Sequence, residues 1–256
     1  MKKAFLGLTL MLVILLLCPL AAHAKSDPGK NIFDVSEGQV RVEKVSAQTN
    51  RVFYGKGQKD VPVDAELTVI GKSIAGGLIR EGKPKMNVIF VASGVTAHIR
   101  LSGVEITPSD GGLIGTFRFP AFGISDGATV YVTLADGTTN KLVGASGCAG
   151  IEVSRTSASE FGTLVITDSG SGMLNAQGGS ICPGIGGAYG KQSGNIIING
   201  GTVSAKGGNN GAGIGGGREK DGGNITINGG TVSATGGFRG AGIGGGEAGD
   251  GGNITI

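Results

Sequence analysis

The residues best suited to contact a ligand lie in two variable stretches of an otherwise repetitive sequence. Tyr189 and Arg218 belong to one stretch, and Asn209, Phe238 and Arg239 belong to the other. The two aromatic rings could stack on sugar rings, while Arg239 and Asn209 could form hydrogen bonds with hydroxyl groups. Variation on one face of a repeat protein often marks its binding face. Solvated turn residues without a ligand are the simpler alternative at each position.

Two carboxylates form a second candidate site. Asp221 and Asp250 are one repeat apart, and adjacent like charges are unfavourable without compensation. A calcium ion could bridge them, because carboxylate and carbonyl oxygens suit this cation. Lys220 and Arg218 could neutralise the pair instead, and the nine-residue calcium-binding repeat is absent from the sequence. We therefore expect no cofactor, with calcium as the alternative.

Two cysteines occur in the same local motif, Cys148-Ala149-Gly150-Ile151 and Cys182-Pro183-Gly184-Ile185. If the repeats stack, Cys148 and Cys182 share one lateral position in neighbouring layers. The layer spacing of about 4.8 Å falls within the range of Cα separations in disulfides. An oxidising compartment would permit a Cys148–Cys182 disulfide with a structural role. Two buried thiols fit the same spacing equally well.

The sequence contains no recognisable catalytic constellation. Acid–base chemistry on a sugar chain requires titratable groups that converge on one face. His98 is expected to point outward from a strand, and Asp136 and Glu152 fall on different coils. No glycine-rich segment is followed by the lysine and hydroxyl residue of a phosphate loop. We expect a protein that is not an enzyme, with a polysaccharide lyase or hydrolase as the alternative.

The elements that position these residues are set by an internal repeat. Residues 194–205 recur at 223–234 and begin again at 252–256, a step of 29 residues. Within each repeat, Ile225 and Ile227 alternate with polar residues in one strand, as Val232 and Ala234 do in the next. The motif Gly-Ile-Gly-Gly recurs with the same step and begins at Gly184, Gly213 and Gly242.

Stacking of such repeats predicts an all-β fold, a right-handed parallel β-helix (solenoid) with coils of about 29–33 residues. Asn228-Gly229-Gly230 supplies residues that tolerate positive φ, so the chain can turn between the two strands. Ile196, Ile225 and Ile254 would then form one internal ladder. A single coil cannot bury its own apolar face, so stability must come from contacts between neighbouring coils.

Four segments follow from this pattern. Residues 1–24 have the charged, apolar and small-x-small regions of a signal peptide, and a membrane anchor is the alternative. Residues 25–85, with a loose tail at 25–30, are expected to be an N-terminal cap or the first irregular β coils. Residues 86–190 are expected to form irregular coils. Residues 191–256 carry the regular 29-residue glycine-rich repeats, which stop within a strand as if truncated, or as if the last coil stacks end to end with a partner.

The charge pattern gives little sign of an electrostatic partner. The formal net charge of the whole chain is +3, and two of the lysines lie at the start of the signal peptide. No basic stripe is present, so nucleic acid is not an expected partner. No segment after the signal peptide is apolar enough to cross a bilayer. We expect the mature chain to be secreted or attached to the cell surface.

Residues 93–104, 147–153, 211–217 and 223–227 resemble bacterial secreted and surface β-helix proteins with glycine-rich repeats. Proteins of this kind are commonly described as carbohydrate-binding or adhesin-like. The resemblance implies a non-catalytic module that binds polysaccharide or a host or cell-surface glycan, or that mediates adhesion. A polysaccharide-degrading enzyme and a passive stalk segment of a larger surface protein are the alternatives.

Overall fold

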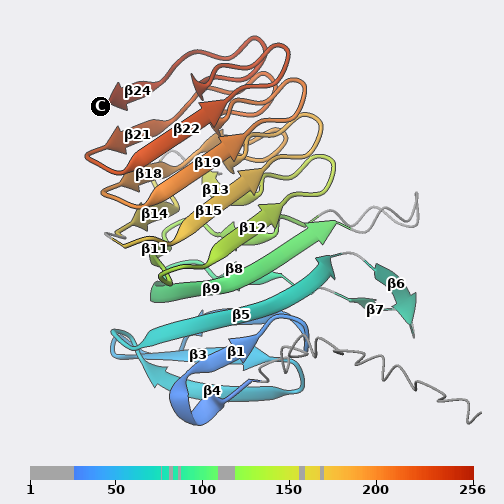
Figure 1. Cartoon of the computed structure of the whole chain (residues 1–256), viewed down its shortest axis with the longest axis vertical. Helices are drawn as coiled ribbons and strands as arrows, with labels where there is room; N and C mark the ends of the chain where they lie inside the picture. Colours follow the sequence, from blue (N-terminus) through green and yellow to red (C-terminus); the bar gives the residue numbers. More distant parts are fainter. Residues whose placement is uncertain are drawn as a thin grey trace, which may run out of the picture.

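The computed structural model describes residues 26–75, 77–80, 83–85, 88–108, 119–155, 159–167 and 170–256. The predicted signal peptide lies outside these residues. All regular secondary structure of the described residues is β strand, apart from one short 3-10 turn, η1 (Pro28–Lys30). Its strands stack as the rungs of a parallel solenoid, so the predicted fold class is confirmed (Figure 1).

A 12-stranded sheet forms two of the three sides of each coil. The first side consists of β11 (Thr129–Leu134), β14 (Thr163–Ile166), β18 (Asn195–Ile198), β21 (Asn224–Ile227) and β24 (Asn253–Thr255). The second side consists of β12 (Thr139–Val143), β15 (Met173–Gln177), β19 (Thr202–Lys206) and β22 (Thr231–Thr235). All neighbours within each side are parallel, as a solenoid requires.

Two long strands connect the two sides in the early part of the chain. β5 (Glu66–Ala75) pairs along most of its length with β9 (Thr96–Pro108). The first half of β9 pairs with β11, and its second half pairs with β12. Gly103 lies between the halves with φ of +67°, a conformation that glycine adopts without strain. In later coils a turn replaces this bend and divides the rung into two strands.

The third side is narrow and rich in glycine. Its parallel rungs are β8 (Ile89–Val91), β10 (Phe122–Ile124), β13 (Ile151–Arg155), β16 (Ile185–Gly186), β20 (Ile214–Gly215) and β23 (Ile243–Gly244). β17 (Gln192–Ser193) pairs antiparallel with β13. A Cβ atom on Gly186 would lie only 2.0 Å from the carbonyl oxygen of Gly215 in the next coil. Glycine is therefore required here by the close approach of neighbouring backbones.

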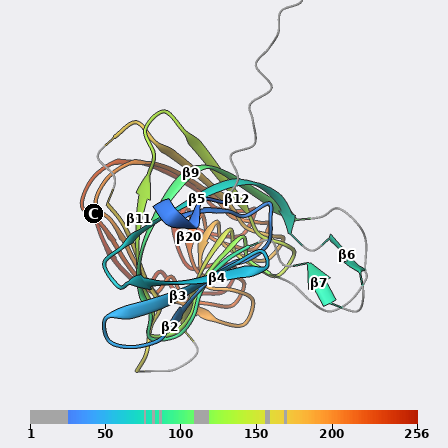
Figure 2. The same ribbon diagram turned by 90° about the horizontal axis from the view of Figure 1, so that it is seen from below.

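The lower end of the stack carries an antiparallel meander of β2 (Val40–Lys44), β3 (Thr49–Tyr54) and β4 (Gly57–Pro62). Figure 2 shows these strands crossing the base of the solenoid. β2 continues into the third side by pairing with β8, and β1 (Ile32–Asp34) pairs with β5. β6 (Gly77–Arg80) and β7 (Lys83–Lys85) form a separate hairpin. Val52 and Val61 are buried, so the hydrophobic core extends into the meander.

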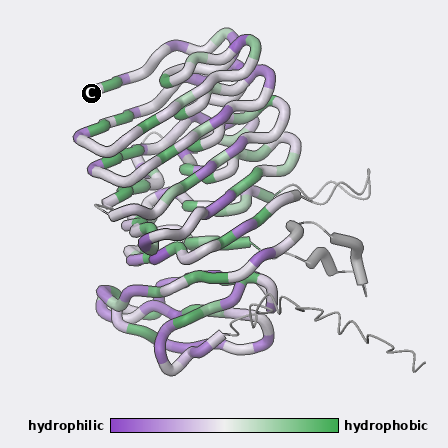
Figure 3. Tube along the Cα trace, viewed as in Figure 1, coloured by the Kyte–Doolittle hydropathy of each residue, from purple (hydrophilic) through white to green (hydrophobic). Residues whose placement is uncertain are grey.

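The core is a set of vertical ladders between the three sides. Ile196 pairs with Ile225 and Ile225 with Ile254, which confirms the predicted stacking, but Ile254 is 40% exposed and so is not internal. Ile196 and Ile225 are fully buried. Figure 3 shows hydrophobic residues recurring at matching places in successive coils. Paired residues in successive coils from β9 onward are up to 36 residues apart and then 34, 32 and 29 apart, so the longer coils exceed the expected range.

Among the described residues, the structure contains no helix that is both long and apolar enough to span a membrane.

Candidate functional site

The two variable stretches form loops on either side of the third-side strands. One loop precedes β20 or β23 at residues 207–212 and 236–241, and the other follows it at 216–222 and 245–251. The Arg218 N–H donates to the carbonyl oxygen of Ile181 at 2.9 Å, and the Glu247 N–H donates to that of Asn210 at 2.9 Å. Each later loop is therefore bonded to the earlier loop of the coil below. The two predicted columns form one continuous surface.

We call this the loop surface. Its members are Tyr189, Asn209, Asn210, Arg218, Glu219, Phe238, Arg239 and Glu247.

The backbone of the loops is repeated even though their side chains vary. Gly190, Glu219 and Ala248 occupy equivalent positions and all have positive φ, at 75°, 60° and 58°. The earlier loops are tight turns in which the backbone returns close to its own starting point. A Cβ atom on Gly207 would lie 2.2 Å from the carbonyl oxygen of Gly211. Stacked coils thus present different side chains from one backbone shape, which is the arrangement expected of a binding face.

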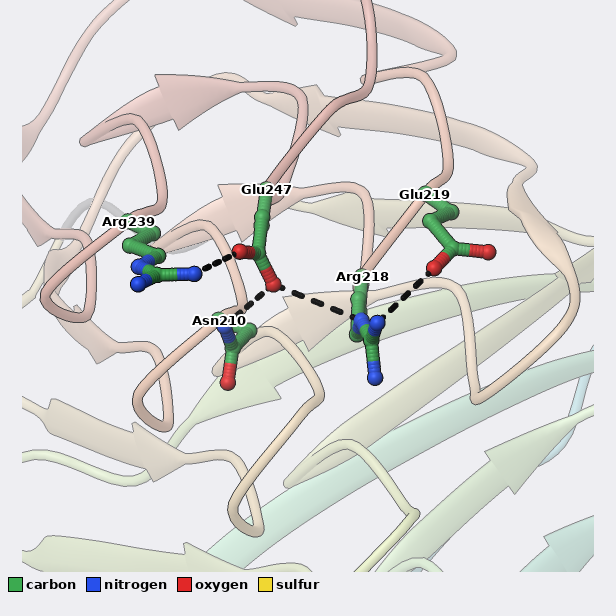
Figure 4. A network of polar contacts seen from close by, with 5 residues as sticks. All are labelled: Asn210, Arg218, Glu219, Arg239 and Glu247. Carbon is green, nitrogen blue, oxygen red and sulfur yellow. Dashed lines mark hydrogen bonds and ion pairs between the residues drawn. The ribbon is translucent and has the colours of Figure 1, made fainter.

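Glu247 lies at the centre of the polar contacts on this surface (Figure 4). One of its carboxylate oxygens forms an ion pair with the guanidinium of Arg239. The other lies 3.3 Å from Arg218 Nε and accepts a hydrogen bond from the Asn210 amide. Arg218 also approaches Glu219, with 3.1 Å between nitrogen and oxygen. Four charged side chains from three loops are thus joined in one network.

The network keeps Glu247 ionised. The hydrogen bond from Arg239 is the main cause that lowers the pKa of Glu247 below its usual value. Desolvation opposes this shift, while the charges of Arg239 and Arg218 and the Asn210 amide reinforce it. Two guanidinium groups and two carboxylates meet in this network, so their formal charges cancel.

The aromatic residues lie at the edge of this network. The Phe238 side chain is 89% exposed, and the Arg239 guanidinium lies 5.9 Å from the centre of its ring. The Arg239 N–H donates to the Asn209 carbonyl oxygen at 3.0 Å. Tyr189 is 60% exposed and lies in the same column as Arg218 and Glu247, two coils below Glu247. The structure therefore groups Asn209, Arg218, Phe238 and Arg239, with Tyr189 farther along the stack.

The two candidate calcium ligands, Asp221 and Asp250, take part in hydrogen bonds between coils. One carboxylate oxygen of Asp221 accepts a hydrogen bond from the Asp250 N–H at 2.9 Å. The other accepts from the Gln192 amide, also at 2.9 Å. The ion pairs of Arg218 go to Glu219 and Glu247. Within the described part of the chain, no group of three or more His, Cys, Asp or Glu residues could hold a metal ion.

The two cysteines occupy equivalent positions in neighbouring coils. The Gly179 N–H donates to the Cys148 carbonyl oxygen at 2.9 Å, and the Gly208 N–H donates to that of Cys182 at 3.0 Å. Both side chains are buried. The vertical alignment that the sequence predicts is present, and the disulfide itself stays a prediction.

The titratable residues considered for catalysis have local structural contacts. The His98 ring stacks on the Tyr131 ring with 4.7 Å between their centres and 8° between their planes. These two residues are directly opposite each other in the β9–β11 pair and face outward. Glu152 on the third side lies 3.3 Å from Lys191 Nζ. Asp136 accepts hydrogen bonds from the Ser171 backbone and hydroxyl in the coil above.

Glu247 and Asn210 also belong to the two variable stretches, but the sequence alone does not assign them a role. The sequence did contain one signal. Glu247 occupies the position of Arg218 one repeat later and carries the opposite charge. What could not be read from the sequence was the pairing of the later loop with the earlier loop of the coil below. That pairing brings Asn210 to Glu247.

Comparison with protein families supports the fold. The family model described as "Beta helix repeat" matches residues 196–218 and 225–247. Each match runs from the first side of one coil, through the second and third sides, into the later loop. No curated protein and no solved structure is significantly similar to the chain. The matched repeats and the stacked parallel strands together make the chain a β-helix repeat protein.

Proposed function

We propose that this chain is a secreted or cell-surface β-helix that binds polysaccharide through its loop surface, without catalysing a reaction. The observation that carries the proposal is the meeting of exposed aromatic, amide and guanidinium groups on one repeated backbone. Phe238 offers a ring to the face of a sugar, and Asn209, Arg218 and Arg239 offer hydrogen-bond donors to its hydroxyl groups.

The scaffold suits a ligand that is itself a repeating chain. Sites on successive coils lie about 4.8 Å apart along the stack, and the rungs that support them are fixed by continuous hydrogen-bonded ladders. A long glycan lying along the stack could contact several loops at once. Adhesion to a glycan-coated surface would follow from the same contacts.

Binding is tested by applying the chain to an array of polysaccharides and measuring the affinity for any that bind. Phe238→Ala should weaken binding at least tenfold, about 1.4 kcal/mol, because it removes the exposed ring. Met173→Ala is the matched control, since Met173 is also an exposed apolar residue but lies on the second side. Absence of binding to every polysaccharide would contradict the proposal, as would equal effects of the two substitutions.

The non-catalytic part of the proposal has a separate test. Incubation with any bound polysaccharide should release neither reducing ends nor unsaturated uronides. Release of either product would favour a hydrolase or a lyase instead. Export is tested by N-terminal sequencing of extracellular or surface-associated material, which should begin at Lys25.

A further inference from the structure

The charges of the loop surface are balanced within the protein. The loops at residues 216–222 and 236–251 carry Arg218, Lys220 and Arg239 against Glu219, Asp221, Glu247 and Asp250. Positive charge is therefore not in excess. A site for an anionic ligand would instead show clustered basic residues that raise the local positive potential.

The guanidinium groups are also committed to partners. Arg239 pairs with Glu247, and Arg218 pairs with both Glu247 and Glu219. An arginine recognises a carboxylate or sulfate by directing paired N–H groups at two oxygens. An anionic sugar would have to compete with the Glu247 carboxylate for the positive charge of both arginines. The Glu247 side chain is only 21% exposed, so solvent screens its ion pairs less than those of a fully exposed carboxylate.

The remaining contacts suit an uncharged ligand. Each guanidinium has five N–H donors, so donors remain for hydroxyl groups after the ion pairs have formed. Phe238 and Tyr189 add exposed rings that do not depend on charge. We infer that the loop surface selects neutral polysaccharides over those that carry uronate or sulfate, and that Glu247 sets this preference by occupying Arg218 and Arg239. This inference rests on the proposed function.

The test compares a soluble neutral glucan or mannan with polygalacturonate, by titration calorimetry at about 0.02 M and about 0.5 M salt. The wild-type chain should bind a neutral polymer with little salt dependence and polygalacturonate at least tenfold more weakly. Glu247→Gln should release the Arg239 guanidinium and remove one of the two carboxylates that pair with Arg218. It should raise the affinity for polygalacturonate about tenfold at low salt, and high salt should abolish the gain.

Glu219→Gln is the matched control, because it removes one negative charge from the same surface but leaves Arg239 paired with Glu247. It should change the affinity for polygalacturonate by less than threefold. Circular dichroism should show that both variants keep the β fold. Equal gains for both variants would overturn the inference, because net charge alone would then explain them. Tight, salt-sensitive binding of polygalacturonate by the wild-type chain would overturn it while leaving polysaccharide binding intact. Failure to bind any polysaccharide would remove the proposed function itself.

Discussion

Asn140 shows how one buried polar residue can join three coils. It is fully buried in β12, where the register places it beneath Leu174. Its side-chain oxygen accepts the Val104 N–H at 3.0 Å, and its amide nitrogen donates to the Met173 carbonyl oxygen at 3.2 Å. Val104 follows the bend at Gly103, where the regular ladder of β9 is interrupted. Asn140 thus replaces backbone partners that the bend removes.

Asn140→Leu should destabilise the chain by about 2–4 kcal/mol, because the buried Val104 N–H and the Met173 carbonyl oxygen lose their partners. Asn228→Leu is the control, since the Asn228 amide bonds to Asn199 on an exposed ladder. That change should cost less than about 1 kcal/mol. Urea denaturation of both variants measures the difference, and equal losses would show that the Asn140 contacts contribute little.

Gly186 tests how closely the coils approach on the third side. It combines φ of +142° with a carbonyl oxygen 2.0 Å from the position that a Cβ atom would occupy. Gly186→Ala should therefore cost about 3 kcal/mol or more, because the neighbouring backbone must move. Gly190 also has positive φ, but nothing lies within 4 Å of its Cβ position. Gly190→Ala should cost only about 1–2 kcal/mol. If thermal or urea denaturation shows similar stability losses for both substitutions, glycine is required at position 186 for its positive φ rather than for close contact between coils.

At the scale of elements, β5, β9 and β12 are joined on their outer face by a column of alternating charge. Glu105 in β9 lies 2.9 Å from Lys72 of β5 and 3.3 Å from Lys141 of β12. Hydrogen bonds from Lys72, and then from Lys141, lower the pKa of Glu105 below its usual value. The column therefore stabilises the folded chain at every pH at which the Glu105 carboxylate is ionised.

This contribution should be complete above the pKa that Glu105 has in the unfolded chain, and it should be lost as the pH falls through the lowered pKa of the folded chain. Glu105→Gln removes it at every pH. The stability difference between wild type and Glu105→Gln should be constant near neutrality and vanish in acid. Its size should be at most about 1 kcal/mol, because the side chains are partly exposed. A difference that grows in acid would contradict the predicted sign.

The repeat made most of these elements predictable, because its 29-residue step fixes which residues stack. Ile225 and Val232 could be assigned to the core from alternation alone. The continuous β9 rung was harder to foresee, since one glycine at position 103 replaces the polar turn of later coils. The antiparallel meander at residues 40–62 has no repeat to reveal its pairing. Contacts between loops, such as Arg239 with Glu247, depend on how far each loop reaches across to its neighbour, which spacing in the sequence does not determine.

For the whole molecule, the stack behaves as a one-dimensional series of similar interfaces. β18 pairs with β21, and β21 pairs with β24, in the same register, and β19 pairs with β22 in the corresponding way. The same register continues on the outside of the stack. The Asn224 amide donates a hydrogen bond to Asn195, and the Asn253 amide donates one to Asn224, each at 2.9 Å. If one of these coils were removed, the coil above it could therefore stack on the coil below it with nearly the same contacts.

Removal of one complete repeat, residues 195–223, should leave a folded solenoid. Asn224 would follow Gly194 directly, and its strand would stack on β14 in the place of β18. The shortened chain should keep its β-sheet circular dichroism and unfold cooperatively, with a smaller m-value because less surface becomes exposed. Removal of residues 195–209 is the control, because it breaks the register and places the residues of one side on another. That chain should lose the cooperative transition. If the first deletion also unfolds the chain, the coils are not interchangeable, and the stability of the stack depends on features particular to the coil that was removed.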